Sequence, residues 1–337
     1  MKTVSIVIPS RNEEKHIAKC LEAITENNYP KEYLTVIVCD GNSKDKTPEI
    51  IADYQNRYSY ITSLRNVKQT TPYGLNLGIT HTCSEIVIVL WAHCFIAPDF
   101  IEQCVNFLEE HEEIGCVGGV IENIYENDNA KIIGFAMTQP FGVGSSHFRT
   151  GNKEGFVDTV PFGAYRREVF EQAGYFDENL IRNQDDEFNF RVRKAGFKIF
   201  LSKKIKTYYP VRSDFKKLFN QFYQYGYWKV YVNTKHHRIT SFRQLVPFLF
   251  VSFLFAGLAL SLFYAVVAIT YFSIILFYFL YGFFSTLKRK MKFKSRFKIV
   301  YCFLILHIAY GLGYANGIGD FTISNLQPDR KMGELTR

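Results

Sequence analysis

The sequence predicts an α/β domain with a mostly parallel sheet, followed by a membrane domain of hydrophobic helices. Two observations carry this prediction. Over roughly the first 120 residues, short apolar runs alternate with helical segments and short loops, which is typical of a parallel sheet with helices on both faces. From Gln244 to Leu287 the chain has no charged residue, and such a stretch is too long for one membrane span of about 20 residues and suits two.

The elements of the α/β domain are expected in alternating order. Strands are predicted at three apolar runs closed by polar or unusual residues, at 4–9, 34–39 and 85–90. Helices are predicted after them, at 13–27, 47–58 and 98–111. In parallel sheets the ligand binds outside the carboxyl ends of the strands, so we expect Pro9, Asp40 and the triplet Trp91-Ala92-His93 to lie at one edge.

We expect the first domain to cover residues 1–232. Its last part, about 213–232, is rich in tyrosine, phenylalanine and tryptophan with lysines between them, which is typical of a helix lying in the membrane interface. A core helix is an equally good interpretation of the first half of this stretch. Trp228 either stacks on a sugar or anchors the helix at the interface.

Residues 233–337 form the expected membrane domain. We predict membrane spans in its three hydrophobic stretches, at about 245–263, 265–284 and 299–319. Glycines and His307 make the third stretch atypical, so it either re-enters the membrane or packs tightly on the hairpin of the first two through small residues.

The loop 288–298 carries seven basic residues and no acid. By the positive-inside rule, this loop and the residues before the hairpin lie in the cytoplasm. We therefore expect a multi-pass protein of the cell membrane with its first domain on the cytoplasmic side. Of the net charge of +8, only +1 is left when these seven residues are removed, so the basicity marks a membrane flank and does not indicate nucleic-acid binding.

Two polar motifs point to a nucleotide. Pro9-Ser10-Arg11-Asn12-Glu13 follows the first strand, and Asp40-Gly41-Asn42-Ser43 follows the second. A carboxylate at a strand end can accept the N–H of a uracil ring and a ribose hydroxyl, and helix N-termini beside it favour a diphosphate. Alone, Asp-Gly-x-Ser is a turn with a helix cap. The two motifs together favour a nucleotide site.

Further motifs extend the pattern: Pro72-Tyr73-Gly74-Leu75-Asn76-Leu77-Gly78-Ile79, Val157 to Arg167, Gly174-Tyr175-Phe176-Asp177-Glu178 and Asn183 to Arg191. With these motifs in this order, over roughly residues 3–230, the chain resembles the family 2 glycosyltransferases, which have the GT-A fold. Within that family it is similar to the succinoglycan-biosynthesis, ExoA-like branch.

The resemblance implies an inverting glycosyltransferase. Its donor would be a nucleotide diphosphate sugar, with a UDP-sugar expected, and its acceptor a lipid-linked saccharide in surface or exopolysaccharide synthesis. Two alternatives stay open. The chain either transfers a sugar to a polyprenyl phosphate, which is already anionic and needs no base, or is a catalytically silent subunit that binds a nucleotide sugar.

The resemblance also implies residue roles. Asp185 matches the aspartate of the family's Glu-Asp-x-Asp pattern and would be the base that takes a proton from the acceptor hydroxyl, with Asp186 as its rival. Without the resemblance, the acids from 185 to 187 are a solvated helix N-terminus. The nucleotide pocket would be lined by Pro9, Arg11, Glu13, Asp40, Asn76, Ala92 and His93. The acceptor or a phosphate would be contacted by Glu187, Arg166, Gln224 and Trp228.

The triplet after the third strand departs from the family pattern. The family places Asp-x-Asp there to hold a divalent ion on the donor diphosphate, whereas this chain has Trp91-Ala92-His93. Three interpretations follow. A divalent cation, Mn²⁺ or Mg²⁺, is held by His93 with the diphosphate and waters; basic side chains such as Arg166 or Arg167 neutralise the diphosphate; or the site is degraded. The retained acids argue against degradation.

Overall fold

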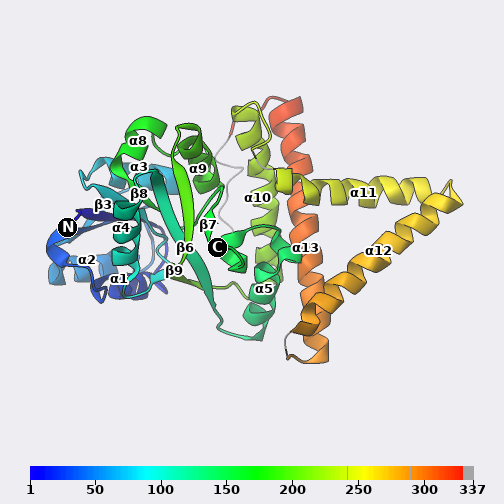
Figure 1. Ribbon diagram of the computed structural model, residues 1–337, viewed down its shortest axis with the longest axis horizontal. Coiled ribbons are helices and arrows are strands. Elements are labelled where there is room, and N and C mark those ends of the chain that lie inside the picture. Colours follow the sequence, from blue (N-terminus) through cyan, green and yellow to red (C-terminus); the bar gives the residue numbers. More distant parts are fainter. Residues whose placement is uncertain (241, 289, 329–337) are drawn as a thin grey trace. The chain divides into compact units, whose positions relative to one another are not determined.

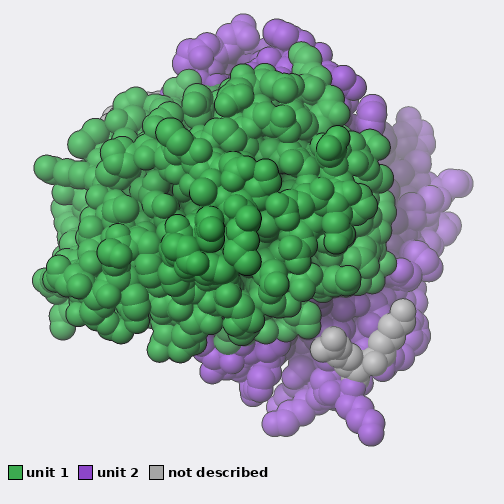
Figure 2. All heavy atoms as spheres, turned by 60° about the vertical axis from the view of Figure 1, so that its left-hand side comes forward, with its two compact units in different colours: residues 1–124, 147–210 green, residues 125–146, 211–337 purple. Residues whose placement is uncertain are grey.

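Figure 1 shows a computed structural model of the chain, which describes residues 1–240, 242–288 and 290–328. The chain divides into two compact units. The first unit comprises residues 1–124 and 147–210, and the second comprises 125–146 and the residues from 211 on (Figure 2).

The first unit is built on one sheet of nine described strands. Their order is β3-β2-β1-β4-β8-β6-β9-β5, and β7 also pairs with β9. Strands β5, β7 and β8 run antiparallel to their neighbours, and the other pairs are parallel. The strands are β1 Val4–Ser10, β2 Leu34–Asp40, β3 Ile61–Arg65, β4 Ile86–Val89, β5 Phe95–Ile96, β6 Ile114–Ile124, β7 Gly155–Phe156, β8 Ala164–Arg166 and β9 Lys198–Pro210.

Helices cover both faces of this sheet, as Figure 1 shows. Apolar residues of β1 alternate between the two faces, so that Val7 joins Leu75 and Phe188 in one buried cluster while Ile6 and Ile8 are buried on the other side. The helices of this unit are α1 Ile17–Thr25, α2 Thr47–Arg57, α3 Thr71–Thr80, α4 Phe100–Glu110, α7 His147–Thr150, α8 Arg167–Ala173 and α9 Gln184–Lys194, with the 3-10 turn η1 Lys31–Tyr33.

The predicted α/β fold is confirmed. Each of the three expected strands and each of the three expected helices is present, with ends shifted by a few residues. The sequence did not predict the short antiparallel strands β5, β7 and β8, because two or three residues carry no periodic signal.

The second unit is helical. Its elements are α5 Asp128–Thr138, α6 Pro140–Val143, α10 Phe215–Lys235, η2 Phe242–Leu245, α11 Val246–Ser261, α12 Ala265–Ser285, η3 Thr286–Lys288, α13 Phe293–Gly317 and the π-helix η4 Ile318–Ile323. Among the described residues, three segments are long and apolar enough to cross a membrane: Phe242–Ser261, Ala265–Ser285 and Phe293–Ile323. Arg289 of the predicted basic loop and residues 329–337 at the end of the predicted membrane domain lie outside the described residues.

Glycines let α13 lie close to its neighbours. A Cβ atom at Gly313 would overlap the carbonyl oxygen of Tyr223 in α10, and one at Gly226 of α10 would overlap the carbonyl oxygen of Tyr310. Gly311 faces α11, where a Cβ atom would overlap another backbone carbonyl. The atypical third stretch therefore packs tightly through small residues, both on the hairpin helix α11 and on α10.

The segment 125–146 leaves the first unit and returns to it. Its helices α5 and α6 pack against α13. His307 of α13 fixes this arrangement, because its Nε2 lies 2.8 Å from the Phe141 carbonyl oxygen and its Nδ1 lies 2.7 Å from the Tyr278 hydroxyl. The Phe141 ring also packs edge-on against the His307 ring. His307, the unusual polar residue of the third stretch, thus links α6, α12 and α13.

Candidate active site

The loops after β1 and β2 hold Asp40 in a fixed orientation. The Ser43 hydroxyl donates to one carboxylate oxygen of Asp40 at 2.5 Å, and the Ser43 N–H donates to the other at 3.1 Å. The Asn12 N–H in turn donates to the Ser43 hydroxyl at 2.8 Å. Since Asp40 pairs with Ser10 in the register of the sheet, the two strand ends lie side by side. The Asp40-Gly41-Asn42-Ser43 segment is therefore a turn, and its hydrogen bonds also hold the Asp40 carboxylate in position for a ligand.

Arg11 and Ser10 border this carboxylate. A Cβ atom at Gly41 would lie 3.3 and 3.4 Å from side-chain atoms of Arg11, so the arginine stem runs beside the Asp40 turn. Ser10 is buried, and its hydroxyl has no hydrogen-bond partner among the described residues. A buried, unpaired hydroxyl favours a ligand partner, so Ser10 belongs with the candidate pocket. The sequence motif contained Ser10, but no role was assigned to it.

The triplet after β4 is fixed by aromatic and polar contacts. The Trp91 ring packs edge-on against Phe162, with centroids 6.3 Å apart. His93 Nδ1 lies 3.4 Å from a carboxylate oxygen of Glu13, and the His93 ring packs edge-on against Tyr209 at 5.5 Å. Glu13 is only 4% exposed. Glu13 and His93 therefore form one polar pair at the carboxyl edge.

The protein donors at this edge do not fit a protein-built metal centre. Trp91 offers no ligand atom, and His93 with Glu13 supplies two donors. Within the described part of the chain, no group of three or more histidine, cysteine or acidic residues is placed to hold a metal ion. Divalent cations such as Mg²⁺ prefer several oxygen ligands.

Asp185 lies in the first turn of α9. This helix follows Asn183, which has a left-handed backbone with φ of 61°, and the Asp186 N–H donates to Asp185 Oδ1 at 3.0 Å. Burial, together with the negative charge of Asp186, raises the pKa of Asp185 to about 6, and the charge of Arg149 opposes this rise. A carboxylate with this pKa can take a proton near neutral pH.

Hydrogen bonds bring the start of α9 to the edge that carries Asp40. Asn189, one turn after Asp185, accepts from the Tyr165 hydroxyl at 2.9 Å and donates to the Thr159 hydroxyl at 2.8 Å. Thr159 precedes β8, which runs antiparallel to β4 and therefore starts at the edge where β4 ends. Asp185 and the triplet after β4 thus share the carboxyl edge of the sheet.

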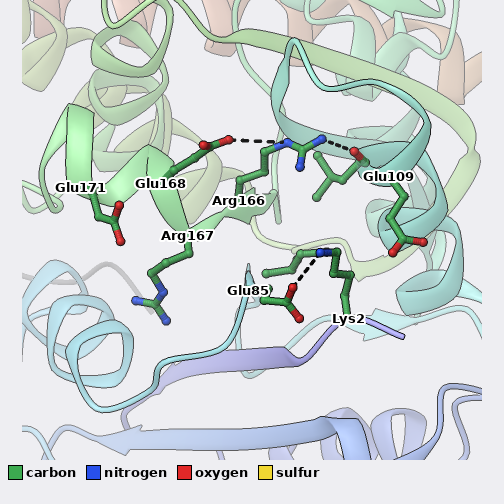
Figure 3. A pocket seen from close by; sticks show the side chains of 9 residues that line it. Lys2, Glu85, Glu109, Arg166, Arg167, Glu168 and Glu171 are labelled. Atoms are coloured by element: carbon green, nitrogen blue, oxygen red, sulfur yellow. Dashed lines mark hydrogen bonds and ion pairs between the residues drawn. The ribbon is translucent and has the colours of Figure 1, made fainter.

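Arg166 and Arg167 lie at the opposite edge. Arg166 pairs in register with Ile86, the first residue of β4, and donates to the Ile114 carbonyl oxygen at 2.8 Å. Arg167 donates to the carbonyl oxygens of three residues before β4. Figure 3 shows both arginines at a pocket of about 280 Å³ that Lys2 and Glu85 also line. This corrects the prediction that either arginine neutralises the diphosphate.

Three other predicted residues serve the fold. Glu187 is fully buried, and its two carboxylate oxygens each accept from Arg191 at 2.9 Å. The Asn76 amide bonds the Phe176 backbone in both directions, at 2.8 and 2.9 Å. The Ala92 side chain is buried. In this structure Glu187 and Asn76 are therefore engaged within the protein, and Ala92 offers a ligand only its backbone.

Trp228 and Gln224 lie on α10 in the second unit. Trp228 is fully buried and packs edge-on against Tyr227 and Tyr231, with Phe321 of η4 beside it. This corrects the suggestion that Trp228 stacks on a sugar, because no face of its ring is accessible. Gln224 is half-buried on the same helix.

Arg149 is a residue that sequence reasoning missed. It lies on α7, in the stretch Ser-His-Phe-Arg between Gly144 and Gly151. Its charge acts on Asp185, and it also lowers the pKa of Cys94, a thiol whose pKa burial raises well above its ordinary value. A lone arginine between glycines gave no motif by which the sequence could have assigned it.

Comparison with known proteins agrees with this geometry. The family model for Glycosyl transferase family 2 matches residues 5–174. A Dolichyl N-acetyl-alpha-D-glucosaminyl phosphate 3-beta-D-2,3-diacetamido-2,3-dideoxy-beta-D-glucuronosyltransferase of Methanococcus voltae is 36% identical over 234 residues, which are 67% of this chain and 72% of that protein. The succinoglycan biosynthesis protein ExoA of Rhizobium meliloti is 28% identical over 246 residues, 72% of this chain and 73% of that protein.

Solved structures share the fold. The mannosyltransferase PcManGT from Pyrobaculum calidifontis, in complex with GDP-Man and Mn²⁺, superposes with a TM-score of 0.64 at 17% identity, over 92% of this chain and 87% of that one. Residues 1–349 of TarS from S. aureus, in complex with UDP, superpose with a TM-score of 0.52 at 17% identity, over 69% of this chain and 65% of that one. At these identities the likeness concerns the fold, which is GT-A-like. The chain belongs to the family 2 glycosyltransferases.

Proposed function

We propose that this chain transfers a sugar from a nucleoside diphosphate sugar, with UDP as the expected nucleotide, to a lipid-linked saccharide, and inverts the anomeric carbon. The observation that carries the proposal is the Asp185 carboxyl group, which lies at the same sheet edge as Asp40 and has a pKa raised to about 6. Support for the acceptor class comes from the dolichyl-phosphate-linked sugar in the name of the Methanococcus voltae relative.

The proposed step needs one base. As the acceptor hydroxyl attacks the anomeric carbon, its proton passes to Asp185, and the bond to the diphosphate oxygen breaks on the opposite face. A retaining route by double displacement would need an additional protein nucleophile at that carbon. The raised pKa makes Asp185 a stronger base than an ordinary carboxylate and still leaves it ionised at neutral pH.

The donor would lie along the carboxyl edge. Asp40, held by Ser43, would accept hydrogen bonds from the nucleobase and ribose, and the buried Ser10 hydroxyl would add a further bond. Arg11 would lie beside the nucleotide, and Pro9 would line its pocket. The Glu13–His93 pair would face the diphosphate, with His93 as a hydrogen-bond donor to it. Asp186 stays the alternative base, because it adjoins Asp185 in the first turn of α9.

The second unit would anchor the enzyme in a membrane and hold the lipid part of the acceptor. The proposal is a multi-pass protein whose three candidate spans leave residues 1–232 and the basic loop 288–298 in the cytoplasm. Gln224 of α10 stays a candidate acceptor contact.

A single-cysteine variant at Lys292, in a background lacking the seven native cysteines, tests the orientation. Labelling by an impermeant maleimide only after cells are opened supports it, and labelling of intact cells rules it out.

The enzymatic proposal is tested with full-length protein in detergent and a synthetic lipid-linked saccharide. UDP-, GDP- and TDP-sugars are each supplied with Mn²⁺, with Mg²⁺ and with EDTA, and product stereochemistry is read by nuclear magnetic resonance. We expect one nucleotide class to react and to give an inverted linkage. A retained anomeric configuration, or no turnover with any donor when nucleotides bind, would exclude the proposed reaction. The EDTA arm decides whether a divalent cation is needed.

A further inference from the structure

The donor diphosphate needs positive charge that the predicted residues do not supply. Arg166 and Arg167 lie at the other edge of the sheet, where they bond backbone carbonyl groups. The donors around His93 do not fit a protein-built metal centre, as described above. Arg11 follows the turn of Asp40, at the proposed nucleoside end. A leaving nucleoside diphosphate gains negative charge as its bond breaks, and preorganised cations or donors stabilise such charge.

Helix α7, which carries Arg149, is anchored in the first unit through the neighbouring residue Phe148. Helix α7 packs on β6, and Phe148 packs against the apolar cluster that contains Phe188 of α9, with Trp91 also packed against it. The guanidinium carbon of Arg149 lies 5.5 Å from the centroid of the Phe148 ring. A short helix anchored by an aromatic ring, with the arginine resting on that ring, holds the cation in one region of the site.

Arg149 interacts electrostatically with residues of both motifs at this edge. Its positive charge acts on Asp185 at the start of α9 and on Cys94, which directly follows His93. The side chain is half-buried. Within the described part of the chain, the guanidinium forms no hydrogen bond or ion pair with another side chain, so its donors are available to a ligand. A guanidinium presents a planar fork of donors that matches phosphate oxygens.

We propose that Arg149 binds the diphosphate of the donor and stabilises the charge that develops on it during transfer. In that step the acceptor oxygen forms a bond to the anomeric carbon, and the acceptor proton goes to Asp185. The bond between the anomeric carbon and the diphosphate oxygen breaks, and its electron pair stays on the diphosphate beside Arg149. The inference rests on the proposed function, since it requires a nucleoside diphosphate as leaving group.

The test compares diphosphate with monophosphate binding. Isothermal titration calorimetry is run on the full-length protein in detergent with EDTA, using UDP, GDP and TDP and the corresponding monophosphates. For the nucleotide that binds, Arg149→Gln is expected to weaken diphosphate affinity by about tenfold or more, because a charge-assisted hydrogen bond is lost. Monophosphate affinity is expected to change less than about twofold, and Arg149→Lys to retain part of the diphosphate preference.

The matched control is Arg193→Gln, which removes the same charge from an exposed position near the other end of α9. It should leave both affinities unchanged. Thermal unfolding of each variant checks that the protein is folded.

Steady-state kinetics give a second readout. Loss of Arg149 should lower kcat by about a hundredfold when the donor saturates, since one preorganised charge contact of the transition state is missing. If Arg149→Gln binds the diphosphate as tightly as the unchanged protein, or if the monophosphate is weakened equally, the inference is overturned while the proposed function stands. If the unchanged protein binds none of the three nucleoside diphosphates, both are overturned.

Discussion

Replacing Asp185 with asparagine should remove activity and at the same time stabilise the protein. Asparagine has nearly the same size and can still accept the Asp186 N–H, but it can neither take a proton nor carry charge. A positioned base contributes about a hundredfold to ten-thousandfold to a rate, so transfer should fall by that factor. Nucleotide affinity should persist, because the substitution leaves the Asp40 turn intact.

The stability gain follows from the pKa of Asp185. The interval between its ordinary value of 3.8 and about 6 corresponds to about 3 kcal/mol of unfavourable ionisation in the folded state. The Asp185 side chain is only half-buried, and solvent weakens electrostatic energies at such a position. We therefore expect the substitution to raise the free energy of unfolding by about 1 kcal/mol. The unfolded chain loses this proton near pH 4 and the folded protein near pH 6, so the penalty grows across that interval and is constant above it.

The assay is thermal unfolding of the detergent-solubilised protein at pH 5 and pH 8, beside transfer activity at pH 8. Asp185→Asn should raise the melting temperature by about 2–4 °C at pH 8 and by less at pH 5. Asp53→Asn, which removes an exposed carboxylate paired with Arg57 at the surface, is the control and should change neither quantity. Full activity in Asp185→Asn, or a lower melting temperature at pH 8, refutes the assignment of Asp185 as a partly buried base.

Three further predictions follow from single contacts. Transfer activity should rise between pH 5 and pH 7 with a midpoint near pH 6, because Asp185 must be ionised, and a profile flat over this range would count against it. Glu187→Gln should lower the free energy of unfolding by about 3 kcal/mol, since it leaves Arg191 without its partner, whereas Glu122→Gln at an exposed ion pair should cost under about 1 kcal/mol, both measured by urea unfolding. Gly313→Leu should destabilise the second unit by about 3 kcal/mol or more through overlap with α10, while Gly319→Leu, with nothing within 4 Å of a Cβ atom, should melt like the unchanged protein.

The strands that carry the nucleotide motifs could be predicted from the sequence, because their apolar runs are continuous and end at polar residues. Val4–Ser10 and Leu34–Asp40 both have this form, and a parallel arrangement then fixes which ends meet. The same reasoning predicted that the triplet with His93 lies at this edge, whereas the contact between His93 and Glu13 became visible only in the structure.

The misplaced residues were missed for different physical reasons. Arg166 was expected near the diphosphate, but local sequence does not encode that β8 runs antiparallel to β4, and this direction sends the arginine to the far edge. For Glu187, a signal existed and was overlooked: Arg191 stands four residues later, the spacing at which a glutamate and an arginine pair on one helix face. For Trp228, one partner of the buried ring is Phe321 of η4, which lies far along the chain and could not be paired with it from local sequence.

The excursion 125–146 sets an order of events during synthesis. Its helices α5 and α6 emerge from the ribosome well before α13, which begins at Phe293, so their packing partner is absent for roughly ten to thirty seconds at ordinary translation rates. During that interval the apolar faces of α5 and α6 lack the helix on which both of them pack in the folded chain. A fragment cut after residue 210 would keep these faces uncovered permanently, so shortened versions made for crystallisation should aggregate unless α13 is supplied.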